Sequence, residues 1–377
     1  MRVFLHAIYG QILFSSYIFW RGYQALPAKK KYRVPFILFF VLELGLYFTG
    51  FLFYKELPDS ILLPIITICN TWYIASAYIT MGLIMLDFLR LTNRIWPWFP
   101  IWIKANRSKV KAYLFTFFII TITLLMIHGH QNVKNPVVKH VNIHIPKTVT
   151  GRKKLTIVMM SDMHFGETID KNYAQKYIRL CNEQNPDLVI IPGDIIDYES
   201  RFAEQMQIEK DLLQIKAPLG IYFTLGNHEY RANKHAKLRW LRKTGCTLLI
   251  DSVATPDSLF YLIGRDDMIN LKRSSLYTLM KDLDPKKPTI VIDHRPNHIN
   301  EIVMNKADLG LHGHTHNGQF WPNSILQKLR HECSYGYYQK GKSQFYVSSG
   351  LGCAGPPFRI GTRSELVVLH IRFNSGS

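Results

Sequence analysis

Long apolar runs dominate the first third of the chain. They cover residues 3–20, 34–54, 61–86 and 112–127. The second run holds one acidic residue and the third has no charge, whereas the first is weakened by His6 and Gln11 and the fourth is shorter. A helix of about 17–25 apolar residues spans a bilayer, so the pattern predicts a transmembrane region of about four helices within residues 1–130. A buried helical hairpin of a soluble protein is the alternative for each run.

Short apolar runs separated by amphipathic stretches follow from about Val137. The runs are LTIVMMSD, PDLVIIPGD, GIYFTLGN and PTIVIDH, and each of them ends in polar residues. Between them, residues 173–183, 202–215 and 234–243 carry apolar side chains at helical spacing. Strands that alternate with helices indicate a layered α/β domain. We therefore expect a second domain over residues 131–377, with its ligand site at the carboxyl ends of the strands.

Charges between the apolar runs predict the orientation of the helices. The first and third connections contain the basic residues Arg21, Lys29, Lys30, Lys31, Arg33, Arg90, Arg94, Lys104, Arg107, Lys109 and Lys111, whereas residues 55–60 hold one lysine and two acids. Because Lys and Arg stay preferentially in the cytoplasm, both basic connections are expected there. The chain then leaves the membrane on the outer side near residue 130, whether or not the first run crosses. We expect an integral protein of the cell (inner) membrane whose second domain is extracytoplasmic.

The net charge of +19 is shared between both parts of the chain. Residues 1–129 hold 13 basic and four acidic residues, and the remainder holds 33 and 23. A basic domain beside anionic lipid headgroups accounts for this balance, and the sequence contains no nucleic-acid-binding motif. We therefore expect a membrane and no nucleic acid as a partner. The five cysteines form no recognisable disulfide framework, although a pair between Cys333 and Cys353 is left open.

Potential metal ligands gather at the ends of five predicted strands. They are Asp162 and His164, Asp194 and Asp197, Asn227 and His228, His294, and finally His314 and His316. Because strand ends in layered α/β domains meet at one rim, we expect these side chains to converge. Carboxylate, amide and imidazole groups suit two divalent cations about 3.5–4 Å apart, a spacing that supports in-line attack on phosphorus. Taken alone, the histidine-rich segment LGLHGHTHNGQF is also compatible with an ordinary polar loop.

Five ordered motifs give the second domain a family resemblance. They are DMH at 162–164, GDIID at 193–197, GNHE at 226–229, DH at 293–294 and GHTH at 313–316. As an ordered set they resemble the calcineurin-like metallophosphoesterases over residues 150–373. The later segment YVSSGLGCAGPPFRIGTRSELVVLHI is similar to the membrane-associated phosphodiesterase branch, although Asn317 stands where many relatives have glycine. The resemblance implies an α/β fold class, a layered α/β/β/α sandwich, here preceded by the α-helical transmembrane region.

The resemblance also implies a role for each residue of the site. One metal ion would be held by Asp162, His164, Asp194 and His316, and the other by Asp194, Asn227, His294 and His314, with Asp194 bridging. His228 would be the catalytic imidazole that contacts the substrate without binding metal. A water activated by the two divalent ions would be the nucleophile. The identity of the ions, Mn, Fe, Zn or Mg, is left open.

Hydrolysis of phosphodiester or pyrophosphate bonds is the activity that these expectations favour. The substrate is then a phosphoester, and a lipid-linked one is favoured because a tethered enzyme meets lipids at high effective concentration. The alternatives are a phosphomonoesterase or protein phosphatase, or a metal-binding sensor or scaffold without turnover. The presence of His228 beside a complete ligand set argues against a scaffold, which needs no proton donor. The oligomeric state is left open.

Residues beside the motifs have competing interpretations. We expect His312 to pack or to support a ligand rather than to bind metal. Asp197 and Glu229 either orient ligands or are simply exposed. Arg295 and Arg359 are candidates for binding a substrate phosphate through two parallel hydrogen bonds.

Overall fold

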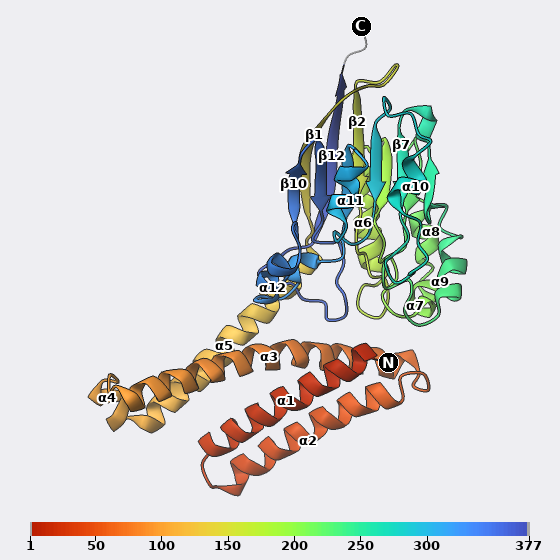
Figure 1. The fold of residues 1–377 in the computed structure, drawn as a ribbon. Coiled ribbons are helices and arrows are strands. Elements are labelled where there is room, and N and C mark those ends of the chain that lie inside the picture. Colours follow the sequence, from red (N-terminus) through yellow and green to blue (C-terminus); the bar gives the residue numbers. More distant parts are fainter. Residues whose placement is uncertain (1, 375–377) are drawn as a thin grey trace. The chain divides into compact units, whose positions relative to one another are not determined.

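The computed structural model describes residues 2–374, with side chains from residue 8 onward. This part of the chain forms two compact units, and the boundary between them lies between His128 and Gly129. The first unit is built from long helices, and the second from two β-sheets with shorter helices (Figure 1). The boundary between the units falls within the last helix of the first group, close to the boundary expected at residue 130.

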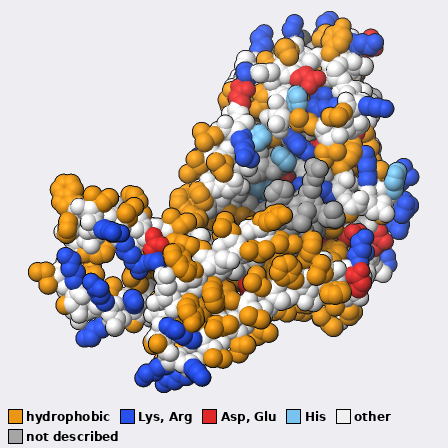
Figure 2. All heavy atoms as spheres, turned by 60° about the horizontal axis from the view of Figure 1, so that its bottom comes forward, with side chains coloured by type: hydrophobic (Ala, Val, Ile, Leu, Met, Phe, Trp, Pro, Cys, Tyr) orange, Lys and Arg blue, Asp and Glu red, His pale blue; other side chains and the backbone are white. Residues whose placement is uncertain are grey.

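The N-terminal helices are α1 (Arg2–Ala25), α2 (Lys30–Leu52), α3 (Asp59–Ile95), α4 (Ile101–Ala105) and α5 (Arg107–Lys134). Among the residues that the structure describes, α2, α3 and α5 are long and apolar enough to span a membrane. Figure 2 shows hydrophobic side chains over much of the surface of these helices, with Lys and Arg gathered in patches. The first predicted span forms the helix α1, but α1 is not one of these three candidates.

Polar side chains on α1 account for its weaker apolar pattern. Gln11 and Ser15 are buried, and both donate to the carboxylate of Glu43 on α2, Ser15 over 3.1 Å. Two turns further along, Arg21 pairs with Asp87 on α3. Hydrogen bonds of this kind hold helices together in lipid, where apolar packing alone gives little net drive. Polar contacts therefore attach α1 to both of its neighbours.

Two six-stranded sheets form the second unit. The first has the order β1 (Val137–Thr148), β12 (Glu365–Asn374), β2 (Lys154–Met159), β3 (Leu188–Ile191), β4 (Ile221–Phe223) and β5 (Thr247–Leu248). The second has the order β10 (Gly336–Lys340), β11 (Ser343–Val347), β9 (Leu309–His312), β8 (Thr289–Ile292), β7 (Tyr261–Gly264) and β6 (Ser252–Ala254). The runs β2-β3-β4-β5 and β11-β9-β8-β7 are parallel, so their carboxyl ends meet at one edge of each sheet.

The two sheets pack face to face, and helices cover their outer faces (Figure 1). Ile190 of β3, Leu262 of β7 and Leu309 of β9 belong to the apolar core between the sheets. The first sheet is covered by α6 (Lys171–Glu183), α7 (Ser200–Gln205), α8 (Ile208–Leu212) and α9 (Lys234–Leu241). The second is covered by α10 (Leu276–Met280) and α11 (Ile299–Met304). The predicted α/β/β/α sandwich is therefore confirmed.

One predicted helix, over residues 202–215, is interrupted. Gln207 lies between α7 and α8 with a φ of +56°, a left-handed conformation that a right-handed helix cannot continue. The break lets Phe202 of α7 and Ile208 of α8 both face the core. Farther along the chain, a short 3-10 turn, η2 (His316–Gly318), precedes α12 (Asn323–Arg330), which buries none of its residues.

Candidate metal centre

The predicted ligands lie on five loops that leave the carboxyl ends of strands. Asp162 and His164 follow β2, Asp194 follows β3, Asn227 and His228 follow β4, His294 follows β8, and His314 and His316 follow β9. Three of these strands belong to the first sheet and two to the second. The residues therefore meet at the edge where both sheets end, as the strand pattern predicts for a ligand site.

Side-chain nitrogen and oxygen atoms converge there into overlapping clusters. Asp162, His164 and His316 form one cluster, and Asp194, His294 and His314 form another, with ligand atoms within 4.8 Å of one another in each. A third grouping joins Asp194 to His164 and His228. Asp194 and His164 thus connect the clusters into one candidate metal centre.

The first cluster brings imidazole nitrogens together beside carboxylates. Nε2 of His164 lies 3.0 Å from Nε2 of His316 and 3.7 Å from Oδ2 of Asp194. Nε2 of His316 is 3.5 Å from Oδ1 of Asp162. The four residues are at most 7% exposed. Two imidazole nitrogens that face each other next to buried carboxylates form a donor set that a divalent cation fits.

The second cluster is organised around His294. Its Nδ1 lies 2.6 Å from the carbonyl oxygen of Pro192, which places a proton on that nitrogen. Its Nε2 is 3.2 Å from Oδ2 of Asp194 and 3.1 Å from Oδ1 of Asn227. The ring of His314 lies 5.1 Å from that of His294. A carbonyl that fixes one ring nitrogen leaves the other as a ligand, which is the usual arrangement for a metal-binding histidine.

Burial and charge set the ionisation of the centre. Burial lowers the pKa of His314 and of His316, and the adjacent histidines lower both further, so these two imidazoles are neutral. Burial alone would raise the pKa of Asp194, but the neighbouring histidines outweigh it and hold that pKa well below its ordinary value.

At His164 and His294 burial would lower the pKa, but the adjacent carboxylates outweigh it and raise that pKa, to about 10 for His294. Burial raises the pKa of Asp162. Divalent cations bind neutral imidazole and ionised carboxylate, so a bound cation would displace protons from these groups.

The backbone at the proposed ligands is strained. The φ angle is positive at five of them: +53° at Asp162, +52° at His164, +53° at Asp194, +71° at His314 and +51° at His316. This left-handed conformation costs a residue other than glycine about 1–2 kcal/mol. Its repetition within one centre indicates that the surrounding fold holds these side chains against their local preference, as is common at functional sites.

Glu229 ties two of the ligand loops together. Its fully buried carboxylate accepts backbone N–H groups from Asp194, Ile195 and Gly226 at 2.8 Å and from Ile196 at 3.2 Å. Four such hydrogen bonds to one carboxylate fix the loop after β3 against the loop after β4. Glu229 is therefore not exposed, and it positions the loop that carries the proposed ligand Asp194.

His228 lies beside the clusters and is held by Asp197. Its Nδ1 is 2.8 Å from Oδ1 of Asp197, and its ring meets the ring of His164 edge-on with centroids 4.5 Å apart. Burial would raise the pKa of Asp197, but the two histidine rings outweigh it and keep that pKa far below its ordinary value. Asp197 is therefore ionised and orients both imidazoles, so that simple exposure is excluded for it as well.

Two cationic residues beside His228 were not expected from the sequence. The guanidinium of Arg231 contacts Nε2 of His228. Lys237 is 1% exposed, and its Nζ donates to the carbonyl oxygens of His228 at 2.6 Å and Asp197 at 3.2 Å. The position of Arg231, two residues beyond the GNHE motif, could have suggested a role. Lys237 gives no such signal, because a lysine in an amphipathic helix normally faces solvent.

Glycines let the loops approach the ligands. A Cβ atom at Gly226 would lie 2.1 Å from Oδ1 of Asp194, and one at Gly313 would lie 2.2 Å from Oδ2 of Asp162. No side chain fits at either distance, so the first glycines of GNHE and GHTH are required by close packing against carboxylates of the centre.

Both arginines considered for phosphate binding are held by other groups of the protein in this structure. Arg295 forms two hydrogen bonds of 2.8 Å with the carboxylate of Asp267. Arg359 is fully buried, donates to the carbonyl oxygen of Ser349 at 2.6 Å and lies 3.2 Å from Nδ1 of His316. Arg359 therefore braces the loop before β12 against a proposed ligand.

His312 lies outside the centre. It is buried in β9, with its Nδ1 2.7 Å from the carbonyl oxygen of Asp293 and its ring stacked on Phe345. The packing role expected for His312 is confirmed.

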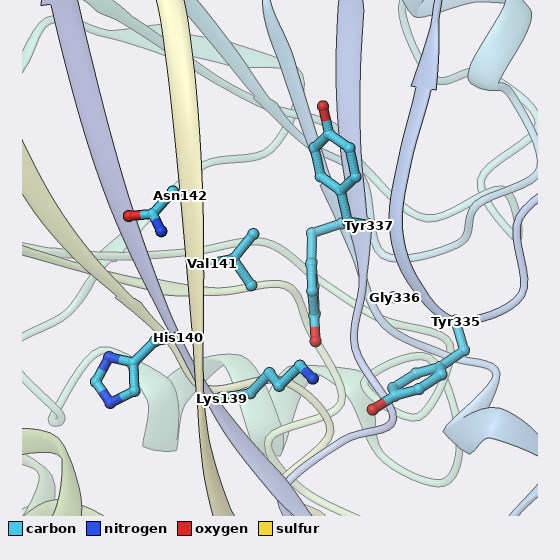
Figure 3. Close-up of a pocket in the computed structure, with 8 residues that line it drawn as sticks. Lys139, His140, Val141, Asn142, Tyr335, Gly336 and Tyr337 are labelled. Atoms are coloured by element: carbon cyan, nitrogen blue, oxygen red, sulfur yellow. The ribbon is translucent and has the colours of Figure 1, made fainter.

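A separate cavity of about 420 Å³ lies between the edge strands β1 and β10 (Figure 3). Lys139 and His140 line it from β1, and Tyr335 and Tyr337 line it from the β10 side. The hydroxyl of Tyr335 donates to Glu365 over 2.9 Å. The lining includes none of the predicted site residues, so this cavity is distinct from the candidate metal centre.

Several known proteins with related sequences are named as metallophosphoesterases. Residues 155–318 match the family Calcineurin-like phosphoesterase. A metallophosphoesterase of Campylobacter jejuni is 31% identical over 316 residues, which cover 80% of this chain and 82% of that protein. One of Helicobacter pylori is 28% identical over 353 residues, 92% of each chain. A "transmembrane protein with metallophosphoesterase domain" of Danio rerio is 31% identical over 269 residues, 66% of this chain and 60% of that protein. Together with the ligand set at its strand ends, these matches show that the chain belongs to the calcineurin-like metallophosphoesterases, a family that hydrolyses phosphoesters.

Proposed function

We propose that this protein is a membrane-anchored phosphohydrolase that cleaves phosphodiester or pyrophosphate bonds with two divalent cations. The observation that carries the proposal is the pair of buried clusters that share Asp194, with His228 beside them. A protein that only binds metal has no need of an imidazole held next to the centre by an ionised carboxylate. The geometry thus favours an enzyme over a metal-binding sensor or scaffold.

Seven residues would hold the cations. Asp162, His164, Asp194 and His316 would bind the first, and Asp194, Asn227, His294 and His314 the second. When bound, the cations would offset phosphate charge and activate a water for attack on phosphorus. A set rich in imidazole favours Fe or Zn over Mg, which prefers oxygen ligands.

His228 would donate the proton to the leaving oxygen. Asp197 engages its Nδ1, so Nε2 is the nitrogen directed to the substrate. The carboxylate of Asp197 fixes the orientation of the ring for this donation. In this structure the guanidinium of Arg231 donates to the same nitrogen, so substrate binding would have to move it onto the phosphate oxygens, which frees Nε2 to carry the proton.

The N-terminal helices would anchor the enzyme in the cell membrane. Residues 1–130 would form the transmembrane region and residues 131–377 the catalytic domain. The candidate spans α2, α3 and α5 support this division, as do relatives named transmembrane proteins. The basic connections favour an extracytoplasmic catalytic domain. A lipid-linked phosphoester is the favoured substrate because the anchor keeps the site near lipid phosphates.

Substrate preference tests the class of reaction. Full-length protein purified in detergent and loaded with manganese should hydrolyse bis(p-nitrophenyl) phosphate faster than p-nitrophenyl phosphate. The reverse order would indicate a phosphomonoesterase or protein phosphatase. A protein that carries its metal but cleaves neither ester would support the sensor alternative.

Replacement of His228 tests the proton donor. His228→Ala should lower turnover of the diester by a factor of about 10²–10⁴ and leave the metal content unchanged. His235→Ala, at an exposed position of α9, is the matched control and should keep full turnover. Undiminished turnover in His228→Ala would remove this residue from the chemistry.

A further inference from the structure

The helix α12 is amphipathic, but its apolar side chains lie on the surface of the protein rather than in its core. Its apolar residues are exposed: Ile325 is 51% exposed, Leu326 is 48% exposed and Leu329 is 79% exposed. Its polar residues Asn323 and Gln327 are instead half-buried against the protein. Successive residues of a helix are turned by about 100°, so the three apolar side chains share one face. A helix that served only the core of its domain would direct this face inward.

A tryptophan and basic residues complete this surface. Trp321, just before α12, is 50% exposed, and we call its side chain together with those of Ile325, Leu326 and Leu329 the α12 face. Lys328 and Arg330 lie in the last turn, and residues 321–331 contain no acidic residue. An apolar face with tryptophan at its border and lysine or arginine beside it is the composition of helices that lie in the interfacial layer of a bilayer.

The α12 face lies close to the end of the apolar helix α5, where the chain enters the second unit. The N–H of Trp321 donates to the carbonyl oxygen of Ile360 over 2.7 Å, and the N–H of Arg359 donates to that of Gly129 over 2.9 Å. Asn132 donates to the carbonyl oxygen of Arg359 over 3.1 Å. Gly129 and Asn132 belong to the last turns of α5, a candidate membrane span (Figure 1). Only a few residues of chain therefore separate lipid from this part of the domain.

The same surface is coupled to the candidate metal centre. The side-chain amide of Asn323 donates to the carbonyl oxygen of Gly318 over 3.0 Å, and a Cβ atom at Gly318 would lie 2.3 Å from the nitrogen of Ser324. Gly318 ends the η2 turn that begins at His316. The start of α12 is thus packed directly on the turn that carries a proposed ligand.

We propose that the α12 face inserts into the interfacial layer of an anionic lipid bilayer and holds the catalytic unit against the membrane surface. Burial of its four apolar side chains in the headgroup region and attraction of Lys328 and Arg330 to anionic lipid both favour this docking. The docking does not depend on the proposed reaction, because the face is defined by exposure and composition alone. It adds to the N-terminal anchor a second contact that fixes the height of the metal centre.

A spin label on α12 tests the docking in the full-length protein. The variant Leu329→Cys is labelled with a nitroxide and reconstituted into vesicles that contain anionic phosphatidylglycerol. Relaxation of the spin label by oxygen is then compared with its relaxation by a water-soluble nickel chelate. Leu271→Cys is the matched control, because Leu271 is 94% exposed. The five native cysteines are free, so the labelled parent protein supplies the background.

The label at Leu329 should collide several-fold more with oxygen than with the chelate, relative to the label at Leu271, and vesicles of neutral lipid should reduce this preference. Equal access of the chelate at both positions would overturn the proposal, because the face would then lie in water. A label at Leu329 that is immobilised and shielded from both reagents would also overturn it, since the N-terminal helices or a second copy would then cover the face.

Discussion

Close packing at single positions decides whether the metal centre can form. Gly226 lies so near Asp194 that an added Cβ would be 2.1 Å from its Oδ1 and 2.6 Å from its backbone nitrogen. Asp194 is also the residue that both proposed cation sites share. A methyl group at Gly226 would therefore displace the carboxylate on which the whole centre depends.

Gly226→Ala should accordingly lose most of its bound metal, as measured by elemental analysis of the purified full-length protein. Gly166→Ala is the control, because a Cβ there would lie 3.4 Å from that of Asp197, an ordinary contact. Equal metal content in the two variants would show that the loop after β4 can shift without disturbing Asp194.

Replacement of Glu229 by glutamine, which has nearly the same size, should still destabilise the protein. In Glu229→Gln the side-chain NH₂ would face two of the four backbone N–H groups that now donate to Glu229. Each unsatisfied buried donor costs about 1–3 kcal/mol. A lower unfolding temperature is expected, with no such change in Glu204→Gln at an exposed position of α7. Equal unfolding temperatures would mean that the loops hold their shape without this acceptor.

At the scale of elements, one ion pair joins the second sheet to a covering helix. Arg265, just after β7, is 1% exposed and pairs with Glu301 of α11 at 3.0 Å. Glu301 also accepts the N–H of Leu276, which begins α10, over 2.7 Å. Burial would raise the pKa of Glu301, but the Leu276 N–H and the Arg265 guanidinium outweigh it and lower that pKa.

A carboxyl whose pKa is lowered by folding adds stability above its ordinary pKa of 4.5 and loses it as the pH falls through the lowered value. Glu301→Gln should therefore destabilise the protein by about 1–3 kcal/mol at neutral pH, and the difference from the parent should shrink below pH 4.5. Thermal unfolding against pH measures this. Asp282→Asn, with a side chain 86% exposed, is the control. A difference that stays constant with pH would exclude the ion pair as its cause.

Elements with regular patterns were predictable, and those set by distant contacts were not. The stripe of α6 and the buried runs of β2, β3 and β8 appear directly in the sequence, because periodicity reflects which side is buried. The left-handed turn at Gln207 does not appear, since nothing local demands it. The order of strands in the two sheets depends on pairing between residues far apart in the chain, which periodicity does not encode.

The candidate site likewise has features that the sequence predicts and features that it does not. Side chains that bind cations are recognisable by type, and the family resemblance then assigned seven of them as ligands and His228 as the catalytic imidazole before their positions were known. Supporting residues such as Lys237 and Arg359 act through backbone carbonyl oxygens, and such contacts leave no trace in residue type or spacing.

At the scale of the whole molecule, the charge pattern predicts on which side of the membrane the second unit lies. An alkaline phosphatase reporter fused after Ser377 should be active, because it folds only outside the cytoplasm. The same reporter fused after Asn106, in the second basic connection, should be inactive. Activity in the second fusion and not in the first would reverse the proposed orientation.

The position of β12 in the first sheet determines when the candidate metal centre can form. Residues 365–374 pair with β1 on one side and β2 on the other, although β1 and β2 are neighbours in the chain. The loop before β12 donates its Leu351 and Gly352 N–H groups to the carbonyl oxygens of Ser161 and Asp162. During biosynthesis β1 and β2 therefore stay unconnected in the first sheet until residues 365–374 have been made. A nascent chain without these residues would therefore lack the loop that is hydrogen-bonded to Ser161 and Asp162 at the candidate metal centre.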